Sequence, residues 1–144
     1  PALNDVLTVL DGVLLVAYVI ATALAVGALV SASLALATRL LGRWSWPRFH
    51  HLAQGLIPIA GAGVFIGLSS LTVTLLKNDG FPVGWVGPTR VAALAAATLW
   101  SLRLVVGIAG VHGGTIARRI AVGLAVLPAL GVANLGWWLL FVGW

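Results

Sequence analysis

Few side chains in this sequence could do chemistry, and Arg103 is the most unusual of them. It lies well inside a long apolar stretch, with Arg90 near one end and His112 near the other. A charge within a membrane span is costly, so such a residue usually serves a function. No Asp or Glu lies in any apolar stretch to neutralise it. We expect Arg103 to pair with backbone carbonyls, a lipid phosphate or a partner subunit, or else to snorkel toward the membrane surface.

The three histidines, His50, His51 and His112, are the only candidates for cofactor ligands. Two histidines from different helices can hold a b-type haem inside a bundle. Here they stand beside arginines at the expected edges of loops, so we predict interfacial histidines and no cofactor, with haem b as the alternative. A metal site is not predicted, because no carboxylate lies nearby to complete one. The sequence has no cysteine, which excludes iron–sulfur and thiolate sites within this chain.

The remaining polar and small residues indicate helix contacts and not catalysis. Gln54 and Asn134 are expected to hydrogen-bond between helices, and Gly63 and Gly67 form a GxxxG packing face. That face suits contacts within one bundle as well as contacts between subunits. No serine has a neighbouring base, no carboxylates are paired, and no glycine-rich loop follows a strand. We therefore predict that the protein is not an enzyme.

Membrane-spanning helices must position all of these residues. Of the 144 residues, 61% are hydrophobic and 8% are charged, and the mean hydropathy is +1.13. A soluble domain cannot hide that much apolar surface. The sequence predicts an all-α integral membrane protein, a four-helix transmembrane bundle in which residues 1–144 form one domain, with spans at residues 13–38, 49–76, 88–110 and 120–142.

Two of these spans carry features suited to protein contact. The second span is expected to be the central and most contacted helix, because it combines small residues with four hydroxyls and is bent at Pro58. In the first span, Ala23, Gly27 and Ser31 recur every four residues, which suits a helix interface or an ordinary lipid-facing helix equally.

The basic residues predict the orientation of the chain. The first and third loops hold five arginines, whereas the other side offers only Lys77 and Arg90. By the positive-inside rule, both termini lie on the non-cytoplasmic side, in a membrane that we expect to be the bacterial inner membrane. The net charge of +5 forms no single soluble patch, so no nucleic-acid partner is predicted. The chain begins at Pro1, compatible with removal of an initiator Met or with an internal fragment.

The features from Leu34 onward resemble a known family. A basic, tryptophan-containing loop leads into RFHHLAQGLIPIAGAGVFIG, followed by a turn-rich loop, a further span, a basic break and a tryptophan-rich span. This order is similar to the C-terminal membrane helices of membrane-bound polyferredoxins of the nitrous-oxide reductase maturation and nitrate reductase quinol dehydrogenase type. The chain lacks their cysteine clusters and has no His between residues 64 and 71. The resemblance implies association with an electron-transfer system and assigns no redox residue.

Three functions remain open at this point. The leading one is a non-catalytic membrane anchor or accessory subunit of a larger complex, whose partners are lipids and other membrane subunits. The second is a small transporter or ion channel. Its weakness is that Asp5, Asp11 and Asp79, the only acids, lie outside the spans, although anion conduction with Arg103 as the attracting charge remains. The third is a haem-bearing electron carrier.

Overall fold

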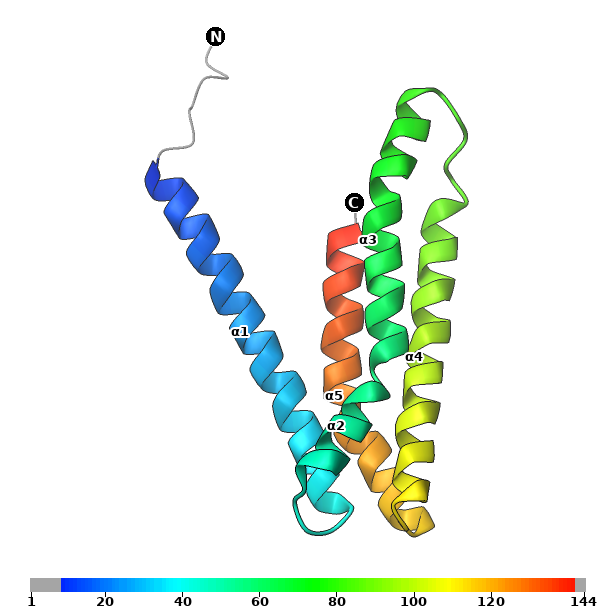
Figure 1. Ribbon diagram of the computed structural model, residues 1–144. Helices are drawn as coiled ribbons and strands as arrows, with labels where there is room; N and C mark the ends of the chain where they lie inside the picture. The colour runs from blue at the N-terminus through cyan, green and yellow to red at the C-terminus, as the bar shows by residue number, and fades with distance from the viewer. Residues whose placement is uncertain (1–8, 142–144) are drawn as a thin grey trace.

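The computed structural model describes residues 9–141 and the side chains of residues 11–139. All regular structure in that part is helical, and the helices are α1 (Val9–Leu40), α2 (Trp46–Gln54), α3 (Ile57–Asn78), α4 (Val86–Val111) and α5 (Ile116–Phe141) (Figure 1). Four of them, all but α2, are long and apolar enough to cross a membrane, which confirms the predicted all-α class with four candidate spans. Asp5 and the predicted end of the last span, residue 142, lie outside the described residues.

The helices pack around α5, and not around the second span as the sequence suggested. Helix α5 contacts α1, α3 and α4, whereas α1 contacts only α5 and α2 closely. In the most apolar window of each span, 33% of the residues of α5 are buried but only 17% of those of α3. The expectation that the second span is the most contacted helix is therefore wrong. Helix α3 contacts α4 and α5, and several of its small or hydroxyl-bearing residues, such as Gly61, Thr72 and Thr74, are exposed, whereas α5 contacts three long helices.

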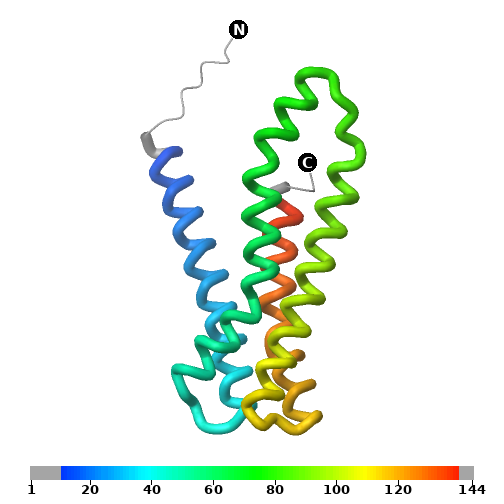
Figure 2. Tube along the Cα trace, turned by 45° about the vertical axis from the view of Figure 1, so that its right-hand side comes forward, coloured from blue at the N-terminus to red at the C-terminus, as the bar shows by residue number. Residues whose placement is uncertain are grey.

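Helix α1 diverges from the rest of the bundle. Its C-terminal part packs against α5, with Leu34, Ala37 and Thr38 buried. Toward its N-terminus, residues 11–29 are exposed on every face. Two views show α1 leaving the other three long helices at an angle, so that the gap widens away from the α1–α2 loop (Figures 1 and 2).

The second span is broken, and not merely bent at Pro58 as predicted. Helix α2 ends at Gln54 and α3 begins at Ile57, so the break lies at residues 55–56. Pro58 falls in the first turn of α3, where its missing N–H is harmless, and so it starts a helix here instead of kinking one. Because Gly55 has no side chain, the backbone at the break packs closely against α4. A Cβ at Gly55 would lie 2.5 Å from Val105 Cγ2 and 3.2 Å from Val105 N.

A break in a membrane span leaves N–H groups that need partners, because lipid offers none. The Ile59 N–H donates a hydrogen bond of 3.2 Å to Ser101 Oγ on α4. Ser101 is fully buried, as are Leu52 before the break and Val105 one turn further along α4. Helix α4 thus supplies both the surface and the acceptor that stabilise the broken span.

Half of the predicted GxxxG face is used inside the chain. Gly63 is buried, and the indole of Trp137 on α5 lies directly over it, in the place that a Cβ would occupy. Gly67, one turn later, is half-buried. The absence of a side chain at Gly63 is therefore what allows α3 and the tryptophan of α5 to pack together.

We predict that Gly55→Ala destabilises the protein by about 1–3 kcal/mol, because the added methyl meets the backbone of Val105 and cannot be accommodated by rotating a side chain. Gly61→Ala is the matched control, since a Cβ at Gly61 meets nothing within 4 Å and Ala favours a helix. Thermal unfolding in mild detergent measures both. Equal stability of the two variants would contradict the close contact between Gly55 and α4.

Candidate functional site: paired histidines at the basic end

The start of α2 sets the position of His51. Ser45, in extended conformation, is the N-cap residue: its Oγ accepts a hydrogen bond of 3.3 Å from the Arg48 N–H. Pro47 occupies the first turn, where no N–H is needed. Leu52 faces inward and is fully buried, which leaves the neighbouring His51 half-buried at the edge of the contact between α2 and α4.

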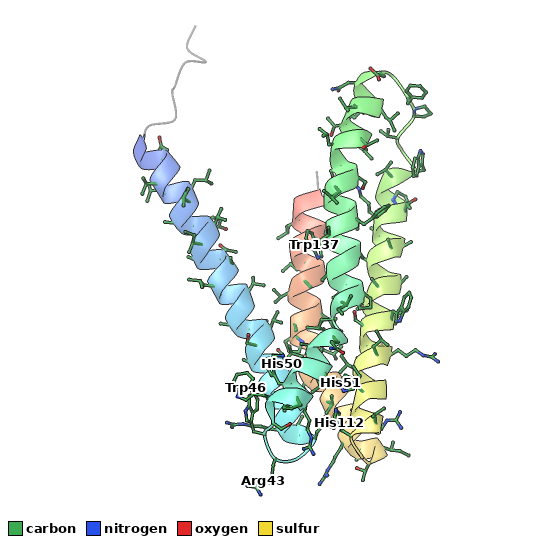
Figure 3. All side chains as sticks on the ribbon, in the orientation of Figure 1. Arg43, Trp46, His50, His51, His112 and Trp137 are labelled. Atoms are coloured by element: carbon green, nitrogen blue, oxygen red, sulfur yellow. The ribbon has the colours of Figure 1, made fainter. Side chains whose placement is uncertain are left out.

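His112 reaches the same place from the end of α4. It is the C-cap residue of that helix, and Gly113 turns the chain with a φ of +75°, a conformation that glycine adopts without strain. His51 Nδ1 and His112 Nε2 lie 3.1 Å apart, and the two rings meet edge to face at a centroid distance of 5.2 Å (Figure 3). One ring must donate and the other accept, so at least one of the facing nitrogens carries no proton.

Two arginines lie near this pair, because Arg48 is close enough to lower the pKa of His112, and Arg119 contacts the turn around it. Arg48 Nη1 donates to the Arg43 carbonyl at 3.2 Å, which folds the first loop over the start of α2. The Arg119 guanidinium of α5 lies across Gly110, where its Cζ is 3.1 Å from the place of a Cβ, and its Cγ reaches Gly114. Gly110 and Gly114 stand on either side of His112 in the sequence, so Arg119 covers the turn that carries this histidine.

Both burial and neighbouring cations act on the pair. Burial lowers the pKa of His112, and the neighbouring His51 and Arg48 lower it further. Among residues 11–139, whose side chains the structure describes, Asp11 and Asp79 are the only carboxylates. The described acids, Asp11 and Asp79, are at the far ends of α1 and α3.

The positions of the three histidines bear on the alternative of a haem-binding protein. His50 is exposed and meets Trp46 edge to face, with ring centroids 5.9 Å apart, so it takes no part in the pair. His51 and His112 contact each other, and they would have to separate before a porphyrin could lie between them. Among the described residues, no group of three or more His, Cys, Asp or Glu side chains could hold a metal ion.

The other candidate residues are scattered over the bundle. Arg103 is exposed, on the opposite side of α4 from the buried Ser101 and Val105. Gln54 is exposed at the end of α2. Asn134 is half-buried and donates to Thr98 Oγ1 on α4 and to the Leu130 carbonyl, both at 2.8 Å.

Sequence reasoning missed two residues of importance. Ser101 was the only hydroxyl between residues 99 and 114, and this isolation within an apolar span was the available signal. For Arg119 the sequence offered only its charge, because the folding of its side chain over Gly110 depends on how α5 approaches α4.

Comparison of the chain with models of protein families, curated proteins and solved structures finds no match.

We predict that the protein loses stability on acidification. Because the pKa of His112 in the folded protein is below its usual 6.5, the unfolded chain binds this proton more tightly. Stability should be constant above that usual value and fall as the pH drops through it toward the lower folded pKa. Melting of the detergent-solubilised protein, followed by tryptophan fluorescence from about pH 8 to about pH 5, measures the loss.

His112→Gln should flatten this dependence, whereas His50→Gln, which removes a histidine outside the pair, should retain it. If His50→Gln instead removed the loss of stability, the lowered pKa would belong to another group than His112.

Proposed function

We propose that this protein is a non-catalytic membrane anchor or accessory subunit of a larger membrane complex. In this proposal the basic end faces the cytoplasm and both termini lie on the opposite side. The observation that supports it most directly is the divergence of α1, which leaves an apolar cleft between α1, α3 and α5.

The cleft has a volume of about 430 Å³. Its walls come from α1, from the α2–α3 break with the start of α3, and from α5; the lining residues are Val26, Val30, Leu56, Ile59, Ala60, Ala129, Val132, Ala133, Gly136 and Trp137. Sites for soluble ligands combine an apolar lining with a few polar groups that orient the ligand. The indole of Trp137 is the only polar side chain here, so the cleft suits an apolar occupant.

A transmembrane helix of a partner subunit is the occupant that fits these walls best. On α5, Ala129, Ala133 and Gly136 face the cleft at helical spacing, and such small residues let another helix approach closely. On α1, the apolar side chains of Val26 and Val30 form the wall. Small residues along the α5 wall are more than a lipid chain requires, since lipid adapts to any apolar surface.

The transporter or channel alternative has less support from the same geometry. An ion path needs polar or charged groups along its walls, and the cleft lining offers one indole. Arg103, the charge that an anion path would use, is exposed on the side of α4 away from buried Ser101. The identity of the complex as an electron-transfer assembly, respiratory or photosynthetic, in a bacterial inner membrane rests on the sequence resemblance alone.

A substitution in the wall of the cleft tests the proposal. Gly136→Leu should leave the isolated protein about as stable as the wild type, because a Cβ at this cleft-lining position meets nothing within 4 Å, but should block the approach of a partner helix. We expect the fraction of protein in the complex, measured by native mass spectrometry after mild extraction from its own membrane, to fall about tenfold, equivalent to about 1.4 kcal/mol.

Gly107→Leu is the matched control, an equally open glycine on α4 one turn from Arg103. It should leave the complex intact. A wild-type protein that is always monomeric would contradict the proposed function. Loss of the complex with Gly107→Leu alone would move the interface to the outer face of α4.

The contribution of Arg103 to assembly is testable separately. If Arg103 pairs with a partner or with a lipid phosphate, Arg103→Leu should weaken assembly while insertion becomes easier by about 2.5–3.5 kcal/mol. Arg103→Lys should restore assembly only in part, because an ammonium cannot reproduce the bidentate fork of a guanidinium. Co-purification of the complex with each variant measures the effect. A complex that stays intact with Leu at this position means that Arg103 only snorkels.

A further inference from the structure

Four basic side chains converge at one end of the bundle, and we call them the basic cluster: Arg48, His51, His112 and Arg119. Arg48 and His51 lie one turn apart on α2, His112 ends α4, and Arg119 comes from the first turn of α5. The histidines touch at 3.1 Å, and Arg119 lies across the glycines that flank His112. The members of the cluster therefore come from three helices and lie around the turn between α4 and α5.

This arrangement is unfavourable without a counter-charge. Like charges held together repel, and no carboxylate of this chain lies near them in the sequence. The one hydrogen bond from an arginine of the cluster, Arg48 Nη1 to the Arg43 carbonyl, offers a neutral acceptor that does not balance the charge. Burial is the largest cause of the lowered pKa of His112, and the nearby His51 and Arg48 lower it further. An anion between these groups would relieve the repulsion.

From this convergence we propose that the basic cluster binds one phosphate-type anion, carried either by the headgroup of an anionic phospholipid or by a soluble phosphate ester. Guanidinium groups match the oxygens of a phosphate in a bidentate way, and imidazole N–H groups add further donors. With an anion present both rings can be protonated, because each then donates to phosphate oxygens instead of one donating to the other.

The surroundings place the cluster at the depth of lipid headgroups. The rings of Trp44, Trp46 and Phe49, around the start of α2, contact one another edge to face or tilted, with centroids 5.5–5.8 Å apart. Such aromatic groups are typical of the membrane interface. Figure 3 shows Trp46, His51 and His112 at the same end of the molecule as the labelled Arg43. Both a lipid phosphate and a phosphate in the adjacent water can reach this position.

The test compares the protein in nanodiscs of phosphatidylcholine alone, in nanodiscs that also contain phosphatidylglycerol, and in phosphatidylcholine nanodiscs with added glycerol phosphate. The increase in melting temperature with anion concentration gives an apparent affinity of the protein for each anion. An increase with phosphatidylglycerol only assigns the site to a lipid headgroup, and an increase with glycerol phosphate as well assigns it to phosphate in general. No increase with either anion overturns the proposal.

Two neighbouring arginines provide a matched pair of variants. Arg119→Gln should weaken the apparent affinity about tenfold or more, as expected for a lost charge-assisted hydrogen bond. Arg118→Gln makes the same change of charge at an exposed residue next to it, and should change the affinity less than about twofold. Equal effects of the two variants would show general attraction to a basic surface and overturn the site.

A second variant covers the case in which Arg119→Gln fails to fold. Arg48→Gln removes a member of the cluster from α2, and its folding is checked by the melting temperature in phosphatidylcholine alone. It should weaken the apparent affinity to a similar degree. It should also reduce the change in the imidazole signals of His51 and His112 that we expect when the anion binds, measured by NMR of labelled histidine. Unchanged affinity in this variant contradicts the proposal.

Discussion

The arrangement of the bundle depends on one contact, in which the broken second span rests against α4. A membrane protein cannot leave backbone N–H groups unpaired in lipid, so a break in a span must be supported by protein. Here the support has two parts: Gly55 lets the backbone approach Val105, and Ser101 Oγ accepts the Ile59 N–H at 3.2 Å. Because Val105 and Ser101 both lie on α4, these contacts hold the end of α2 and the start of α3 against that helix.

The position of α2 in turn explains both the cleft and the basic cluster. Helix α2 contacts α1 on one side and α4 on the other, at the basic end of the bundle. Among the long helices, α1 packs closely against α5 alone, through its C-terminal part. The short helix α2 also carries Arg48 and His51 toward the end of α4. The divergence of α1 and the basic cluster are thus both related to the position of α2.

The sequence was sufficient for the fold class and for four helices able to span a membrane, because long apolar runs report directly on burial in lipid. The sequence showed that Pro58 disturbs the second span, but it predicted a bend and not a break. A proline in the first turn of a new helix cannot be told from a proline inside a bent helix unless the start of the helix is known. The sequence also assigned the central position to the second span. Composition shows how apolar a helix is and how many small residues it holds, but the number of neighbouring helices depends on the three-dimensional arrangement.

The candidate site was predictable as a set of residues but not as a geometry. His50, His51 and His112 were equal candidates in the sequence, and only the packing of α2 on α4 pairs two of them and leaves His50 on Trp46. This packing ties α2 to α4 at two levels, through the histidines at the basic end and through the Gly55 contact one turn further along. Leu56 and Ile59, which follow directly after that contact, line the apolar cleft. The walls of the cleft and the basic cluster therefore share one rigid connection, and a displacement of α2 at either place would alter the other.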